Sequence, residues 1–253
     1  MGEGDRRTPG PADVAAVLAD VAQLGPFFTV ATGSSPAVDA RPVGGLYAGR
    51  DDALAERIGH VRRVLGPDDP VTAHRVAASI TFQGLAALLV SAPYAAVVVH
   101  GVLPELTERT LHWTPSAPSP WPLWCPEPTA APDPAALADA LVDGHLAPLV
   151  AAVRVQVAVS ERILWGNAAS AVAAAKRLVA QRWPASADRA ARVAQRLLDT
   201  GPLAGAGELL PARLPDRVWT FRRRSCCLYY RTHDGGLCGD CVLHHRPTGR
   251  GSR

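Results

Sequence analysis

Apolar residues recur every three or four positions through much of the chain, and this spacing predicts a protein built mainly from helices. The clearest examples are 12–24, 51–65 and 188–199. A glycine–proline pair follows each of them closely, which is typical of a helix C-terminus. Longer apolar runs predict a helix over 71–90 and another over 134–161, kinked near Pro148, with helical character continuing through 162–182.

Two sites interrupt this helical pattern. Pro93 is expected to end its helix, because proline lacks the amide hydrogen that a helix interior uses, and residues 95–100 then predict a buried strand or a new helix start. The step Trp165-Gly166-Asn167 also has low helix propensity. Either two helices meet there, or the glycine lets another element approach closely. Asn167 fits a hydrogen bond to the C-terminal segment and a cap or interhelix bond equally well.

Few segments have the alternating pattern of strands. Short strands are expected over 27–31, 110–113 and 218–222, and loops over 33–50 and 203–217. The expected fold class is therefore α-dominated α+β, with a helical body, a few short strands and a C-terminal loop that carries most of the cysteines.

A proline- and tryptophan-rich stretch, 110–133, differs from the rest of the chain. Its prolines exclude a helix and a central strand, so a connecting loop is expected. Trp113, Trp121 and Trp124 are too apolar to remain in water, and either pack on the core, which we favour, or form a wall of a ligand pocket. Cys125 is expected to be a small buried apolar residue.

These patterns divide the chain into regions. They are a disordered N-terminus at 1–10, an N-terminal helical and mixed region at 11–109, the connecting loop at 110–133, a helical region at 134–217, a cysteine-bearing segment at 218–245 and a basic tail at 246–253. No formal charge lies between Arg75 and Glu105, but polar residues and Pro93 interrupt this run, so a core helix is expected rather than a membrane span. The polar first ten residues predict a cytoplasmic protein.

Composition adds a charge asymmetry. The 26 basic residues include a single lysine, Lys176, and the chain has one asparagine. This usage is typical of the codon bias of a GC-rich bacterial genome. The arginine excess is thus no nucleic-acid signal by itself, and no nucleic-acid partner is expected. The net charge of the whole chain is +3, yet the segment from Asp216 to the C-terminus contains eight arginines and only three aspartates. The positive charge therefore lies around the cysteines.

Four of the five cysteines form the pattern Cys-Cys-x10-Cys-x2-Cys: Cys226, Cys227, Cys238 and Cys241. Only the second pair has the knuckle spacing of zinc sites, and vicinal side chains diverge in an extended backbone. A [2Fe–2S] cluster is wider and fits this spacing better. Zinc, with His233, His244 or His245 as alternative ligands, stays open. Disulfides also stay open, although they are rare in the cytosol.

The segment RRRSCCLYYRTHDGGLCGDCVL, Arg222 to Leu243, resembles the C-terminal signature of FhuF-like ferric iron reductases. Residues Ile163 to Ser170 (ILWGNAAS) resemble the central helix region of that family, whereas the first 130 residues match more loosely. The resemblance implies a [2Fe–2S] cluster on the four cysteines of the C-terminal loop. It also implies electron transfer to iron held by a siderophore.

Further residues near the cysteines are candidates for docking a substrate or an electron donor. They are Arg222, Arg223, Arg224, Arg231 and Tyr230. Cations here would raise the reduction potential and attract an anionic chelate or donor, although a solvated basic strand explains them equally well. The sequence offers no convincing catalytic triad, phosphate-binding loop or dinucleotide fingerprint. Electrons are therefore expected from an external donor, a ferredoxin-like protein or a reductase.

The function expected is a [2Fe–2S] ferric-siderophore reductase, an oxidoreductase that releases iron in the cytoplasm by one-electron reduction of chelated Fe(III). A peripheral position at the inner membrane surface is left open. Two alternatives remain: a structural zinc protein, with nucleic-acid binding through its basic tail, or an iron–sulfur redox sensor or electron carrier.

Overall fold

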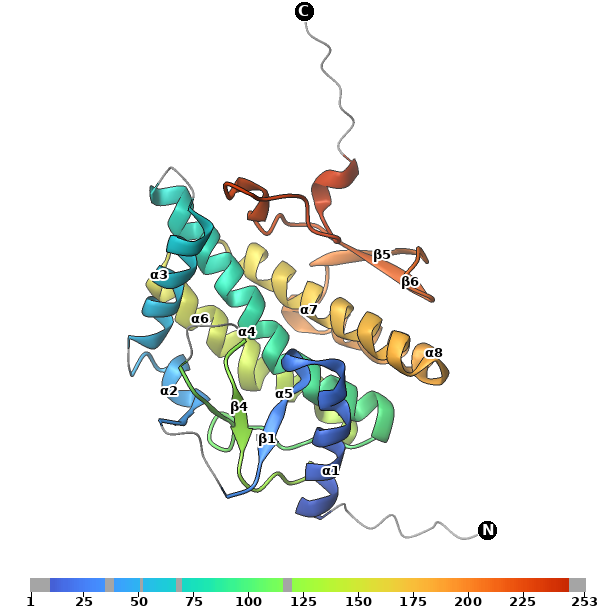
Figure 1. The fold of residues 1–253 in the computed structure, drawn as a ribbon. Helices are drawn as coiled ribbons and strands as arrows, with labels where there is room; N and C mark the ends of the chain where they lie inside the picture. Colours follow the sequence, from blue (N-terminus) through green and yellow to red (C-terminus); the bar gives the residue numbers. More distant parts are fainter. Residues whose placement is uncertain (1–9, 35–38, 51, 67–69, 116–119, 246–253) are drawn as a thin grey trace, which may run out of the picture.

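A long apolar helix, α4 (Pro70–His100), is the centre of the structure, with the other elements packed around it (Figure 1). The structure is a computed structural model that describes residues 10–34, 39–50, 52–66, 70–115 and 120–245. The other helices are α1 (Pro11–Val21), α2 (Val43–Tyr47), α3 (Ala53–Leu65), α5 (Leu137–Leu141), α6 (Ala147–Gln156), α7 (Glu161–Arg182) and α8 (Ala187–Leu198). Nearly all of the expected N-terminal region 1–10 and the tail 246–253 lie outside the described residues.

The strands form two small sheets. β1 (Val30–Thr32), β2 (Arg41–Pro42), β3 (His112–Trp113) and β4 (Leu123–Cys125) pair in the order β1-β4-β3-β2, and β5 (Gly207–Pro211) pairs with β6 (Trp219–Arg223). Among the strand pairs of the described residues, only β1–β4 is parallel. The expected α-dominated α+β fold is confirmed.

In several places the burial of side chains, and not the local sequence pattern, determines the secondary structure. Pro93 does not end its helix, because α4 runs on to His100 with almost every side chain between Val76 and Val98 buried or half-buried. The loss of one helical hydrogen bond is therefore outweighed by packing on all sides. Two segments, Val71–His100 and Pro134–Gln156, are apolar and long enough to cross a membrane, with 78% and 50% of their most apolar windows buried within the protein. The first value agrees with the expected core helix.

The proline-rich stretch also differs from expectation. β4 is a central strand, flanked rather than broken by Pro122 and Pro126, so three residues between them remain free to pair. The expected loop at 203–217 contains β5, and the expected loop at 33–50 contains α2.

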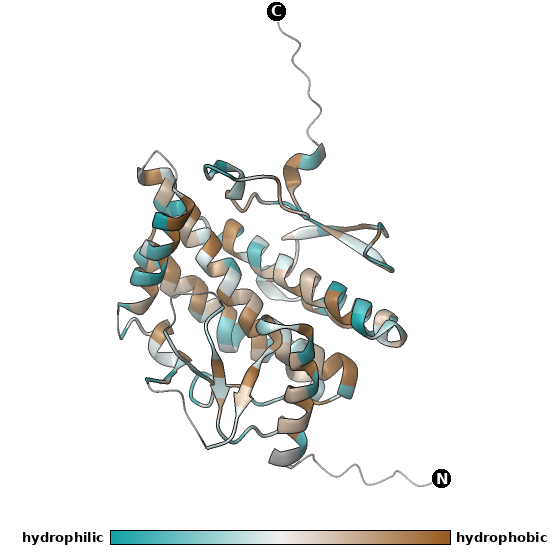
Figure 2. Ribbon diagram, viewed as in Figure 1, coloured by the Kyte–Doolittle hydropathy of each residue, from teal (hydrophilic) through white to brown (hydrophobic). Residues whose placement is uncertain are grey.

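The helical region after residue 134 is divided rather than simply kinked. A π-helical turn at Val142–Leu146 precedes Pro148, and the helix ends at Gln156 before α7 begins. Within α7 the Trp165–Asn167 step is continuous helix. Figure 2 shows α8 alternating between apolar and polar residues, as expected for a helix with one face on the core.

Candidate metal centre

The cysteine-bearing segment leaves β6 and crosses the ends of α7 and α4 that lie close together (Figure 1). Its two halves are joined at their base, because the amide of Arg223 donates to the carbonyl of Asp240 at 3.1 Å. A second turn, in which the Cys241 amide donates to the Cys238 carbonyl at 3.0 Å, forms the knuckle. The segment is therefore a closed loop that carries one cysteine pair on each side.

Two of the four sulfur atoms lie at the separation expected of thiolates that share one metal ion. Cys227 Sγ lies 3.7 Å from Cys238 Sγ, and two thiolates sharing one tetrahedral metal with bonds of about 2.3 Å lie about 3.8 Å apart. Cys226 Sγ and Cys241 Sγ each accept a backbone amide, from Leu228 at 3.3 Å and Leu243 at 3.4 Å. Among the residues that the structure describes, no three Cys, His, Asp or Glu side chains form a site for a single metal ion.

The close sulfur pair shares its protons unequally. The hydrogen bond from the Cys238 thiol lowers the pKa of Cys227 to about 6, with help from the positive charge of Arg223, and raises the pKa of Cys238. Burial raises the pKa of Cys226. In this pair the negative charge is thus favoured on Cys227, and the thiolate is the form that ligates a metal.

Backbone geometry turns the loop sharply after the vicinal cysteines. Leu228 has φ of 71°, a left-handed conformation that is uncommon for a residue with a side chain. Further on, a side chain at Gly235 would collide with the Tyr229 carbonyl and the Thr232 hydroxyl, whereas Gly239 has open space. Gly235 is therefore required where the loop packs on itself.

Replacing Gly235 with alanine is expected to speed the loss of iron from the protein several-fold, because the loop between the cysteine pairs must open to accept the methyl group. The measurement is the rate at which an Fe(II) chelator bleaches the visible absorbance under anaerobic conditions. Gly239→Ala is the matched control and should bleach at the wild-type rate. Equal rates for the two variants would contradict this packing argument.

A buried chain of polar groups connects the loop to both central helices. Arg223 Nη2 donates to Asn167 Oδ1 at 2.5 Å, and Asn167 Nδ2 donates to the Ser79 carbonyl at 2.8 Å and to Ser79 Oγ at 2.9 Å. Ser79 Oγ in turn donates to the Cys227 carbonyl at 2.8 Å. Both interpretations of Asn167 therefore hold: it bonds across two helices and, through its partners, positions the cysteine segment.

Gly166 explains why the segment can lie so close to α7. A Cβ atom at this position would collide with Ser225 Oγ, one residue before the first cysteine of the motif. The low-propensity step in the sequence thus marks a close approach within an unbroken helix, the second of the two expected possibilities. Ser225 Oγ and Arg223 Nη1 are buried there without a hydrogen-bond partner among the described residues.

A second buried contact fastens β6 to α7. Lys176 Nζ donates to Asp216 Oδ1 at 2.7 Å and to the Trp219 carbonyl at 2.6 Å, and lies 3.9 Å from the centre of the Trp219 ring. Burial lowers the pKa of Lys176, and Asp216 opposes that shift. Arg177 Nη2 then reaches Asp240 Oδ1 at 3.4 Å, which connects α7 to the knuckle.

The predicted docking residues fall into three groups. Arg222 forms an ion pair with Glu208 on the neighbouring strand, whereas Arg224 and Arg231 are exposed. Tyr230 is exposed and accepts a hydrogen bond from Arg231 at 3.0 Å. Arg223 is only 1% exposed and cannot contact a docked molecule, so it leaves the docking set. The positive charge of its guanidinium instead acts to lower the pKa of Cys226, Cys227 and Cys238.

A cavity of about 670 Å³ opens beside the close sulfur pair, between α3 and α4. Cys227, Cys238 and Tyr229 line one end of it, and Trp121 and Phe27 line another part. The contribution of α3 and α4 to this cavity was not predicted from the sequence. The signal that could have revealed it is Gly84, the one glycine within this long apolar helix.

The tryptophans of the proline-rich stretch have different roles. Trp113 is buried in the core and stacks on Trp121 at 4.4 Å between ring centres. Trp121 is also buried but borders the cavity, so it is both a core and a pocket residue. Trp124 lies against His112 and donates to the Gly33 carbonyl at 2.9 Å. Cys125 is buried, as expected, and burial raises the pKa of its thiol.

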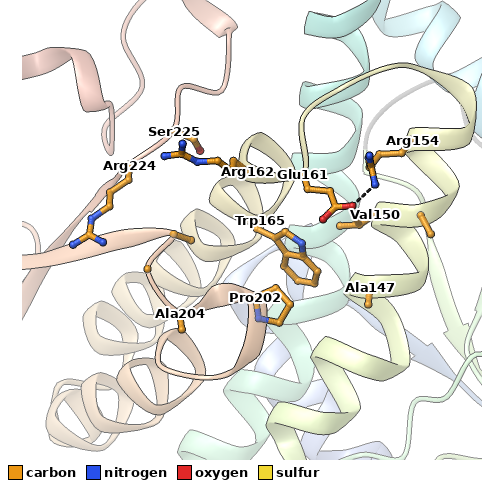
Figure 3. Close-up of a pocket in the computed structure, with 13 residues that line it drawn as sticks. Ala147, Val150, Arg154, Glu161, Arg162, Trp165, Pro202, Ala204, Arg224 and Ser225 are labelled. Atoms are coloured by element: carbon orange, nitrogen blue, oxygen red, sulfur yellow. Dashed lines mark hydrogen bonds and ion pairs between the residues drawn. The ribbon is translucent and has the colours of Figure 1, made fainter.

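Another hollow, of about 520 Å³, lies between α6, α7 and the chain before β5 (Figure 3). Trp165 and Pro202 lie close together there, and Arg154 pairs with Glu161. Arg224 also contributes to its lining. No cysteine is among its described lining residues, so it lacks direct contact with the sulfur atoms.

Within the described residues, His233 and His244 do not form part of a metal-binding group with the sulfur atoms. His244 Nε2 lies 2.9 Å from the Cys238 carbonyl, and His233 is exposed. The side chain of His245 lies outside the described part of the structure.

Comparison with known families agrees with this geometry. The family model described as ferric iron reductase FhuF-like transporter matches residues 82–218, and the one described as FhuF 2Fe-2S C-terminal domain matches residues 223–243. No curated protein matches the chain. The second match covers all four motif cysteines and supports a [2Fe–2S] cluster in place of zinc. Because the first match alone covers more than half of the chain, this protein belongs to the FhuF-like ferric iron reductase family and carries a C-terminal [2Fe–2S] domain.

Proposed function

We propose that this protein is a ferric-siderophore reductase, which takes one electron from an external donor and uses it to reduce chelated Fe(III) to Fe(II). The observation that carries the proposal is the position of Cys227 and Cys238, which line one end of an open cavity. A one-electron carrier held by these sulfurs lies where a small molecule can approach it. When bound, the [2Fe–2S] cluster supplies that single electron.

The protein residues around the site hold the thiolates and tune them. Backbone amides of Leu228 and Leu243 and the buried charge of Arg223 stabilise negative charge on the sulfur atoms. Such donors and cations raise a reduction potential, which makes it easier for the site to accept an electron. Ser79 and Asn167 fix the loop on the helices and keep its geometry constant.

Reduction alone is sufficient to release the metal from its chelator. Fe(III) is a hard ion that oxygen ligands hold strongly, whereas Fe(II) is held more weakly and exchanges its ligands faster. No bond of the chelator has to break, so no nucleophile, general base or oxyanion site is needed. We place this reaction in the cytoplasm, with a ferredoxin-like protein or a reductase as the electron donor, and assign docking of that donor to the exposed Arg224 and Arg231.

Anaerobic stopped-flow spectroscopy tests the proposed reaction. The protein is reduced with dithionite, freed of excess reductant and mixed with a ferric siderophore in the presence of an Fe(II)-specific chromophoric chelator. We expect the visible absorbance of the oxidised cluster to return while one Fe(II) is trapped for each cluster reoxidised. Reoxidation by oxygen without any reaction with ferric chelates would identify a sensor or electron carrier, and overturn the proposal.

A further inference from the structure

The hollow of Figure 3 has the size of a small-molecule site. Its lining comes from α6, from the first turns of α7, and from the residues directly before β5 and directly after β6. The volume of about 520 Å³ falls within the range of about 300–1,000 Å³ that is typical of ligand pockets. The hollow is therefore large enough for a ligand of mononucleotide size.

The charged side chains of this hollow leave an excess of positive charge. Glu161 forms an ion pair with Arg154, so its negative charge is already balanced. Arg162 and Arg224 are both exposed, and their guanidinium groups have no partner among the described residues. In Figure 3 the Arg162 side chain extends from α7 toward the segment that carries Arg224 and Ser225. The hollow therefore offers two free guanidinium groups, which bind the oxygens of phosphates and carboxylates through paired N–H groups.

Trp165 gives the hollow an aromatic wall with an unused hydrogen-bond donor. The residue is only 8% exposed, and its ring lies beside Pro202. Its indole nitrogen has no acceptor among the described residues, yet it is not enclosed as the unpartnered indole nitrogens of Trp113 and Trp219 are. Because the N–H group of a buried tryptophan normally finds a partner, this one fits a ligand that brings both a planar ring and an acceptor.

Other kinds of occupant fit these residues less well. A cation would meet Arg162 and Arg224 without a free acid to balance it, because Glu161 is already paired. A purely apolar molecule would cover the guanidinium groups and the indole N–H without replacing their water. A metal ion would find few ligands, since Glu161 is the one acid among the described lining residues and no histidine or cysteine is with it.

We propose that the hollow of Figure 3 is a binding site for a planar aromatic phosphate of mononucleotide size. The ring of the ligand packs against Trp165 and Pro202. Its phosphate pairs with the guanidinium groups of Arg162 and Arg224. The site is separate from the cavity between α3 and α4 and does not depend on the reduction of ferric chelates. Since the lining residues after β6 lead directly into Cys226, the bound ligand contacts the chain just before the cysteine motif.

Calorimetry with FMN and riboflavin tests the ligand class. The two probes share one planar ring, and only FMN carries the phosphate. The full chain is titrated with its cluster oxidised, so that no electron passes to the probe. We expect wild type to bind FMN at least about tenfold more tightly than riboflavin, and at least about tenfold more tightly than inorganic phosphate. AMP, titrated in the same way, tells whether a purine ring serves as well as a flavin ring.

Two variants separate the phosphate contact from the ring contact. Arg162→Gln removes one free charge, so it should bind FMN at least about tenfold more weakly and leave the weak binding of riboflavin unchanged. Trp165→Leu removes the aromatic wall and should weaken FMN and riboflavin alike. The matched control is Arg192→Gln on α8, an exposed arginine outside the lining, which should bind FMN as wild type does. Arg224 is left unchanged because it is also assigned to docking of the electron donor.

A third variant keeps the test decisive if the buried Trp165→Leu fails to fold. Ala151 is exposed on α6 and lines the hollow, so Ala151→Trp fills the space from its open side and should block FMN. The visible spectrum of each variant should match wild type, which shows that the fold and the cluster are intact. Wild-type affinity for FMN in Arg162→Gln or Ala151→Trp would overturn the site. So would equal affinity of wild type for FMN and riboflavin or for FMN and inorganic phosphate, or a failure of both FMN and AMP to bind.

Discussion

Replacing Cys226 or Cys241 by serine is expected to abolish the visible absorbance and the ferric reductase activity together. Each sulfur is one of the four predicted ligands and accepts a hydrogen bond from one backbone amide, which cannot replace a lost ligand. Serine is a harder and far less acidic ligand than a thiol, so the cluster should not survive anaerobic purification. The measurements are iron and sulfide content, visible absorbance and Fe(II) production.

The fifth cysteine provides the control for this prediction. Cys125 lies buried in β4, in the four-stranded sheet, and is not part of the four-cysteine motif. Cys125→Ser should keep its colour and activity, although a buried hydroxyl lowers the stability of the fold by about 1–3 kcal/mol. Ferric reduction that persists in Cys226→Ser or Cys241→Ser after iron and sulfide are lost would disprove the mechanism.

Removing the buried charge of Arg223 is expected to lower the reduction potential of the cluster by about 50–100 mV. One charge at a separation on the order of 10 Å, with an effective dielectric constant of about 20, contributes about 1.7 kcal/mol, or about 70 mV for one electron. The variant is Arg223→Met, which keeps most of the buried volume. The measurement is an anaerobic redox titration followed by visible absorbance.

Two controls separate charge from packing in this experiment. Arg223→Lys keeps the positive charge, so its potential should stay closer to wild type than that of Arg223→Met. Arg224→Met removes an exposed charge that solvent screens, so its potential should shift by a smaller amount. A wild-type potential in Arg223→Met, with the cluster intact, would show that the buried cation does not act on the sulfur atoms.

The site could be predicted from sequence where its signal was local. The four cysteines lie within sixteen consecutive positions, and the family resemblance covers the same stretch. The contacts that hold the loop are long-range and leave no such trace: Ser79 and Asn167 are 88 positions apart, and each reaches the loop from a different helix. The glycine before Asn167 gave the one useful hint, since its low helix propensity pointed to a close approach.

Errors in the predicted fold have the same origin. Pro93 and the prolines around β4 were interpreted by local rules, but burial of α4 and the short spacing between prolines overrode them. β5 was missed because its residues carry little alternation, and it is a strand only because it pairs with β6. The docking role of Arg223 was wrong because exposure cannot be deduced from a run of three arginines.

The burial of Lys176 has a practical consequence for labelling this protein. It is the only lysine in the chain and is 2% exposed, so amine-reactive esters should find no accessible side-chain amine on the folded surface. Cross-linking to a redox partner through a side-chain amine of this chain should therefore fail while the protein is folded. Acylation of this amine becomes possible only when β6 separates from α7. The acylation rate therefore reports how often the C-terminal strand opens locally.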